Sequence, residues 1–168
     1  MMVFGEAAIA GDRHAAGRLA ASRALAQLDP AARLAYDGPR PIVVGVDAAV
    51  SITHGTARAL AVAARVPALG IDLCSVDDRL AALVDRYLAG ERALATTPWA
   101  CAACLAAKEA GLKALGLGLL DGGMFDGACP IRVASLDPPR LADSSLALRL
   151  ETARDGAVAI VWRVSARV

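Results

Sequence analysis

The chain has 168 residues, of which 57% are hydrophobic and 4% aromatic, so one compact domain or two small fused halves can form around a core of Ala, Leu and Val. The formal net charge is +1 and no block of Lys or Arg stands out, which argues against a nucleic-acid partner held by charge. No apolar run reaches the roughly 20 residues that span a bilayer, and the apolar start is too short for a signal peptide. We therefore expect a cytoplasmic protein with no membrane partner.

The first part of the chain predicts one helix followed by several short strands. A helix is expected over residues 12–28, because apolar positions recur at helical spacing, Asp12 can cap its start and Asp29-Pro30 follows its end. A Gly- and Pro-rich loop is expected at residues 37–41. The strand candidates after it cover residues 42–46, 48–53, 57–66 and 68–73.

The second part predicts two helices and then a group of strands. A helix from Asp77 or Asp78 to about Leu88 comes first. The strongest helix of the chain follows over residues 98–115, with Thr97 at the N-cap and Pro98 where a missing N–H costs nothing. Strands are expected over residues 131–136, 145–150 and 158–164, with turns at 137–140 and 154–156. The order predicts an α+β fold of two αβββ-like halves, residues 1–66 and 67–168.

Three ionisable side chains are candidates for phosphate chemistry. Glu109 and Lys113 are four residues apart and share one helix face, and Asp72 ends an apolar strand. Each has an ordinary alternative: a solvated i,i+4 ion pair for the first two, and a turn or capping aspartate for the third. Together the two carboxylates could bind magnesium, which takes one or two protein carboxylates and fills its shell with water and substrate phosphates. Lys113 could neutralise the same phosphates.

A hydroxyl and an imidazole lie at the end of one predicted strand, in the segment Ser51-Ile52-Thr53-His54-Gly55. Both groups can hydrogen-bond a phosphate. The alternative interpretation is a turn with an exposed histidine.

Three motifs follow one another along the chain. They are Ser51-Ile52-Thr53-His54, then Gly70-Ile71-Asp72, and then Lys108-Glu109-Ala110-Gly111-Leu112-Lys113-Ala114-Leu115-Gly116. This ordered set resembles the 4'-phosphopantetheinyl transferase superfamily, in its larger, surfactin-synthetase-activating branch. Residues 17–25 also resemble the N-terminal helix of that branch, and residues 88–92 its acidic segment. The resemblance covers most of residues 12–120.

The resemblance implies a fold of two halves related by a pseudo-twofold, with coenzyme A between them, in a monomer. It implies transfer of the 4'-phosphopantetheine group of coenzyme A to a serine of an acyl or peptidyl carrier protein, such as those of polyketide and nonribosomal peptide synthases. Asp72 and Glu109 would hold magnesium against the pyrophosphate, and Lys113 would contact the phosphate that moves. Glu109 would also be the candidate base for the carrier serine.

Further residues would bind the coenzyme in this family. Arg13, Arg18, Thr53 and His54 would face the 3'-phosphate and the outer part of coenzyme A. Lys108 and Lys113 would also bind the coenzyme.

Two positions depart from the family pattern. Cys74 stands where the larger branch has a second acidic residue, and Leu105 stands where the family has tryptophan. Both favour an alternative function, that of a non-catalytic or repurposed homologue that binds coenzyme A, acyl-coenzyme A or a carrier protein.

Overall fold

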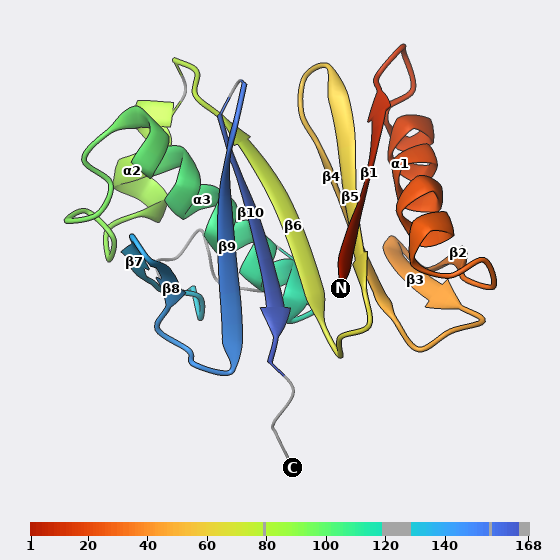
Figure 1. Ribbon diagram of the computed structural model, residues 1–168. Coiled ribbons are helices and arrows are strands. Elements are labelled where there is room, and N and C mark those ends of the chain that lie inside the picture. The colour runs from red at the N-terminus through yellow and green to blue at the C-terminus, as the bar shows by residue number, and fades with distance from the viewer. Residues whose placement is uncertain (79, 119–128, 155, 165–168) are drawn as a thin grey trace.

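The computed structural model describes residues 1–78, 80–118, 129–154 and 156–164. It confirms the predicted α+β class (Figure 1). The elements are β1 (Met2–Ala8), α1 (Arg13–Leu28), β2 (Arg33–Asp37), β3 (Arg40–Val44), β4 (Ala49–His54), β5 (Arg58–Ala64), β6 (Leu69–Ser75), α2 (Leu80–Tyr87), α3 (Pro98–Ala114), β7 (Val133–Leu136), β8 (Pro139–Leu141), β9 (Leu146–Ala153) and β10 (Gly156–Arg163).

Both long helices begin where the capping residues predict. The Asp12 side chain accepts hydrogen bonds from the backbone N–H groups of His14 and Ala15, and the Thr97 side chain accepts one from Ala100. Three strands were not predicted, namely β1, β2 and β8. β1 is held by pairing with β5, far along the chain, and such a distant contact leaves little local signal. β2 and β8 are short and belong to the hairpins that they form with β3 and β7.

The strands form two three-stranded antiparallel sheets, in the order β1-β5-β4 and β6-β10-β9, and two hairpins, β2-β3 and β7-β8. Each half of the chain runs strand, long helix, hairpin and two further strands, with α2 inserted before the long helix in the second half. In each sheet the last strand is central. The αβββ description therefore lacks the strand that precedes each long helix and one of the four strands that follow it. Residues 65–68, where the predicted boundary falls, connect the two sheets.

Alternation along the strands separates the core into layers. On β5, Ala59, Ala61 and Ala63 face α1, while Val62 and Ala64 belong to a cluster shared with the other sheet. In the same way α3 covers one face of the sheet that contains β6 and β10. Figure 1 shows the two sheets side by side, with α1 on the outer side of the first and α3 behind the second. The shared cluster consists of Val62, Ala64, Leu69, Ile71, Leu73, Val158 and Ile160.

A glycine on the first strand of each half lets the long helix come close. A Cβ placed at Gly5 would overlap the carbonyl oxygen of Ala20 in α1, and one placed at Gly70 would overlap that of Ala110 in α3. Since Gly70 lies two residues before Asp72 on β6, the same close approach brings α3 against that carboxylate.

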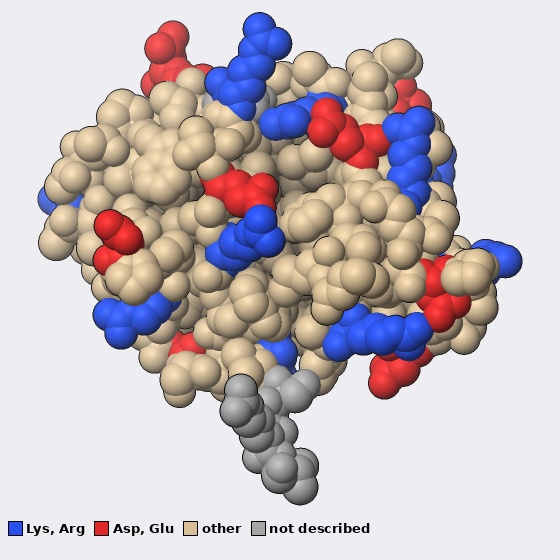
Figure 2. Space-filling view, in the orientation of Figure 1, with Lys and Arg blue, Asp and Glu red and all other residues tan. Residues whose placement is uncertain are grey.

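Figure 2 shows acidic and basic side chains interspersed on one face. Among the described residues, none of the helices combines the length and apolar composition that crossing a bilayer requires.

Candidate functional site

The centre of the site is an ion triad that joins β6 to α3. Asp72 alternates along β6 with Ile71 and Leu73, which enter the shared cluster, so its side chain points the other way, toward α3. The Lys113 ammonium donates to Asp72 Oδ1 at 2.8 Å and to the Ile71 carbonyl at 3.0 Å, and it lies 3.7 Å from Glu109 Oε1. The structure thus brings together the three residues that the sequence placed in two separate motifs.

The triad contains two carboxylates and one ammonium. This excess of negative charge shifts the pKa values of Glu109 and Lys113. Burial raises the pKa of Glu109, and the charge of Asp72 raises it further, while Lys113 offsets part of the shift. Burial alone would lower the pKa of Lys113, but Asp72 and Glu109 outweigh it and raise that pKa. The lysine is therefore held protonated, and the group as a whole attracts further positive charge.

Thr53 fixes the orientation of Asp72 from the other half of the chain. Its hydroxyl donates to Asp72 Oδ1 at 3.0 Å and accepts from the Leu73 N–H at 3.2 Å. Two residues earlier on β4, the Ser51 hydroxyl accepts from the Ile71 N–H at 3.1 Å. β4 and β6 belong to different sheets, and these side-chain bonds connect them. Thr53 is 3% exposed and its hydroxyl points at Asp72, so the structure does not bring it to a coenzyme-facing surface.

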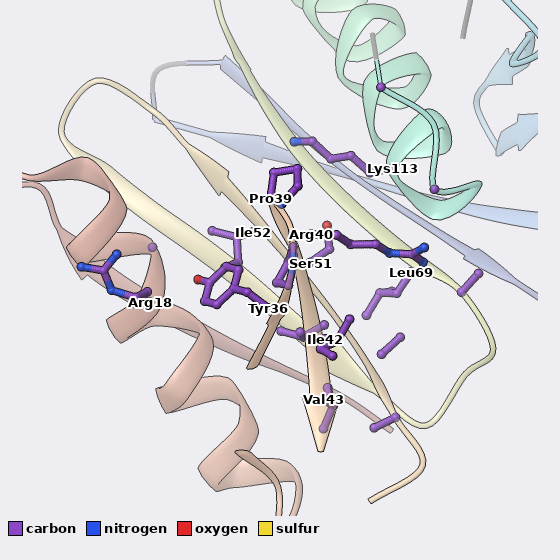
Figure 3. A pocket seen from close by; sticks show the side chains of 18 of the residues that line it. Arg18, Tyr36, Pro39, Arg40, Ile42, Val43, Ser51, Ile52, Leu69 and Lys113 are labelled. Atoms are coloured by element: carbon purple, nitrogen blue, oxygen red, sulfur yellow. The ribbon is translucent and has the colours of Figure 1, made fainter. Parts of the chain in front are cut away.

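A first cavity, of about 650 Å³, lies on one side of the triad. The β2-β3 hairpin, α1, β4 and the end of α3 form its walls, and Figure 3 shows Arg18, Tyr36, Arg40 and Lys113 around it. The part of the lining that the structure describes has no Asp or Glu. Its basic and imidazole groups are those of His14, Arg18, Arg40, His54 and Lys113. Such a lining suits an anionic ligand.

A second cavity, of about 700 Å³, lies on the other side. Asp72, Glu109 and Asp77 line it, together with Arg13, His54 and Cys74 and an apolar wall of Ile9, Leu80, Leu83, Tyr87 and Leu105. His54 borders both cavities, and the triad has Lys113 in the first lining and both carboxylates in the second. The ion triad therefore stands between a cavity lined by basic groups and a partly apolar one.

The two departures from the family pattern, Cys74 and Leu105, both face the second cavity. Burial, reinforced by the charges of Asp72 and Glu109, raises the pKa of the Cys74 thiol to about 12. The thiol is neutral at physiological pH and is a poor ligand for a hard cation.

His54 packs against the first turns of α1. Its Nε2 is buried and has no hydrogen-bond partner within the described parts of the chain. A Cβ at Gly17 would lie 2.5 Å from that nitrogen, so the glycine makes room for the ring. Burial lowers the pKa of His54, and the nearby charge of Arg13 adds to the effect, against a backbone hydrogen bond to Arg13 that raises it.

Lys108 does not reach either cavity. Its ammonium is buried and donates to Glu91 Oε2 at 3.0 Å and to the Tyr87 carbonyl at 2.8 Å. Adjacent residues on a helix point about 100° apart, so Lys108 leaves α3 on a different face from Glu109. It holds the 87–91 segment against α3.

The remaining predicted residues divide between the cavities, Arg18 in the first and Arg13 in the second. Sequence reasoning missed Arg40 and Tyr36 on the β2-β3 hairpin. Arg40 reaches the end of α3, since a Cβ at Gly116 would lie 3.0 Å from its Nη1. The sequence around Arg40 indicated a Gly- and Pro-rich turn, and a turn motif does not predict which cavity the residues beside it will line.

Asp72 and Glu109 fit a magnesium ion whose remaining coordination positions are filled by a bound ligand and water. No group of three or more His, Cys, Asp or Glu side chains gathers as a ready-made metal site in the described ranges. Magnesium needs only one or two protein carboxylates when phosphates and water supply the rest. Asp72 and Glu109 already share one cation, the Lys113 ammonium, which shows that their oxygens converge.

No family model matches the chain, and no curated protein matches its sequence.

Proposed function

We propose that the protein is a magnesium-dependent 4'-phosphopantetheinyl transferase, which moves phosphopantetheine from coenzyme A to a serine of an acyl or peptidyl carrier protein. The observation that carries the proposal is the convergence of Asp72, Glu109 and Lys113 between a cation-lined cavity and a second cavity that is partly apolar. The repeated order of elements and the repeated strand order also support the two-halved fold with a pseudo-twofold that this family has. We further propose that one chain is active alone as a monomer.

In the proposed reaction, the first cavity holds the nucleotide end of coenzyme A. Arg18, Arg40 and His54 line this cavity and would neutralise its phosphates, and Lys113 would contact the pyrophosphate from the end of α3. His54 Nε2 is buried, so the ring would have to turn and take up a proton before it could donate a hydrogen bond to the coenzyme 3'-phosphate. These contacts fix the β-phosphorus beside the two carboxylates.

The carrier serine approaches from the second cavity. Its hydroxyl oxygen forms a bond to the β-phosphorus, the bond from that phosphorus to the bridging pyrophosphate oxygen breaks, and adenosine 3',5'-bisphosphate leaves. Glu109 takes the serine proton, directly or through water, and its raised pKa makes it a better base. Bound magnesium would polarise the phosphates and offset the negative charge that develops on the leaving group.

The test is intact-mass spectrometry of several apo-carrier proteins after incubation with the pure protein, coenzyme A and magnesium. The expected result is a gain of one phosphopantetheine mass on at least one carrier, abolished by a chelator and restored by added magnesium. Glu109→Gln should lower the rate by at least about 100-fold, within the range of general-base loss.

The matched control is Glu151→Gln, which changes a carboxylate on β9 that pairs with Arg149 at an exposed position. Its rate should equal that of the wild type. No mass gain on any carrier, or equal rates for Glu109→Gln and the wild type, would refute the proposal.

The second candidate function is a module that binds coenzyme A, acyl-coenzyme A or a carrier protein without transfer. The neutral Cys74 thiol beside the carboxylates favours it, because it removes one negative ligand from the place where the metal would bind. Titration calorimetry separates the two functions. A transferase should bind coenzyme A more tightly with magnesium, whereas a module that uses the cation-lined cavity alone should not.

A further inference from the structure

We infer that Thr53 is a positioning residue that holds Asp72 Oδ1 and so turns Asp72 Oδ2 toward the metal and the coenzyme pyrophosphate. The inference rests on the proposed function for the identity of the ligand. It differs from the role that the sequence motif implies for Thr53, which is direct contact with the coenzyme 3'-phosphate.

The hydrogen bonds around Thr53 leave its hydroxyl little freedom to do anything else. The hydroxyl has one proton, and that proton goes to Asp72 Oδ1 at 3.0 Å. The Leu73 N–H donates to the Thr53 hydroxyl oxygen at 3.2 Å and so helps to fix the direction of its proton. Thr53 is 3% exposed, so water competes weakly for these bonds.

The two oxygens of Asp72 are therefore unequal. Oδ1 accepts from both Thr53 and Lys113, whereas no group in the described parts of the chain hydrogen-bonds Oδ2. A carboxylate held by one oxygen presents the other in a fixed direction. Asp72 lines the second cavity together with Glu109, so Oδ2 is the oxygen that remains for a ligand there.

Thr53 matters most when the ligand is bound. In the proposed complex Lys113 turns to the phosphate, and its bond to Oδ1 weakens. The Thr53 bond then remains as the restraint on the carboxylate, and it comes from β4 in the other half of the chain. Partners that orient a metal ligand in this way typically change metal affinity by about 10–100-fold when they are removed.

The experiment compares three substitutions that separate orientation from packing. Thr53→Val keeps the shape of the side chain and removes the hydroxyl, and Thr53→Ser keeps the hydroxyl. Ser51→Ala is the matched control, because it removes a hydroxyl bond from β4 to a β6 N–H without touching Asp72. Thr53→Ala replaces Thr53→Val if the latter does not fold, as judged by thermal melting.

Two readouts are measured for each variant. One is the binding of Mn²⁺, used as a probe in place of magnesium, by electron paramagnetic resonance with coenzyme A present. The other is the magnesium concentration for half-maximal transfer, with the KM for coenzyme A. For Thr53→Val we expect both metal constants to rise at least about tenfold, with the KM for coenzyme A within about twofold of wild type. Thr53→Ser should restore both metal constants, and Ser51→Ala should leave them at the wild-type values.

Several outcomes would overturn the inference. Wild-type metal constants for Thr53→Val would do so, as would an equal shift for Ser51→Ala or the lack of any Mn²⁺ binding by the wild type. A rise in the KM for coenzyme A alone would instead assign Thr53 to coenzyme contact. If Thr53→Val weakens Mn²⁺ binding but the wild type modifies no carrier, the inference about Thr53 stands and the proposed transfer fails.

Discussion

Ionised Glu109 lowers the stability of the folded state, because it is buried next to a second carboxylate, Asp72, in the proposed metal site. Its folded-state pKa is raised by burial and by Asp72, above the ordinary value of about 4.3. The folded state thus prefers the protonated carboxyl, and stability is lost as the pH rises from that ordinary value through the raised one. Glu109→Gln removes the ionisation, so we expect the variant to melt at a higher temperature than the wild type at pH 7.5 and close to it at pH 4.

Melting curves across this pH range, recorded by circular dichroism, test the prediction. Glu151→Gln is the control and should follow the wild type at every pH, because that carboxylate is at an exposed position. A Glu109→Gln variant that is less stable than the wild type at pH 7.5 would show that the ionised carboxylate stabilises the fold, contrary to this prediction.

Lys108 illustrates the opposite case, a charge that serves stability. Removing one partner of a buried ion pair leaves the other charged group without compensation. Lys108→Met should therefore lower the free energy of unfolding by up to about 3–5 kcal/mol, since Glu91 is 1% exposed and would keep the weaker contact with Arg132 Nη1, 3.9 Å from its Oε1. Adding Glu91→Leu should recover part of the loss, although the Val133 N–H would then lose its acceptor.

Urea unfolding measures both variants. The control is Arg92→Met, which breaks the exposed pair with Asp85 and should cost at most about 1 kcal/mol. If Lys108→Met costs no more than Arg92→Met, the Lys108 ammonium is solvated and free to face a ligand.

At the scale of elements, the contact of α3 with β6 decides whether the site exists. A methyl group at Gly70 would overlap the Ala110 carbonyl, so Gly70→Ala must push α3 away from the strand that carries Asp72. We expect a loss of about 3 kcal/mol in stability and a loss of transfer activity in the remaining folded protein.

Gly5→Ala provides the comparison, since it makes the equivalent clash between β1 and α1, far along the chain from the triad. It should cost similar stability while keeping more activity per folded molecule. Urea unfolding and the carrier mass assay measure the two effects. Equal losses of activity for the two variants would contradict the view that the α3 to β6 contact sets the site.

At the scale of the whole molecule, the shared cluster makes the halves depend on each other. Val62 and Ala64 come from the first half, and Ile71, Val158 and Ile160 come from the second. Neither sheet can bury this face alone. We therefore expect a single unfolding transition in calorimetry, with equal calorimetric and van't Hoff enthalpies. Two separate transitions would show that residues 1–66 and 67–168 fold as independent domains.

Local chemistry in the sequence was enough to locate the long helices and the triad residues. The caps Asp12 and Thr97 act through neighbouring N–H groups, and Glu109 shares a helix face with Lys113 because of helical spacing alone. The α+β class followed from the order of such elements, each recognisable over a few residues. The same spacing rule puts Lys108 on another helix face, although the motif placed it with the cofactor.

Only the tertiary structure decided what each side chain meets. β1 pairs with β5, more than 50 residues later, and Thr53 bonds Asp72 across two sheets. Such contacts depend on strand register and on which face of a sheet meets which neighbour, and a window of sequence contains neither. The cation-lined cavity arises in the same way, because Arg40 and Lys113 meet there only after the β2-β3 hairpin folds beside the end of α3. The sequence determines the groups that can do chemistry, and the packing of the two halves determines which of them act together.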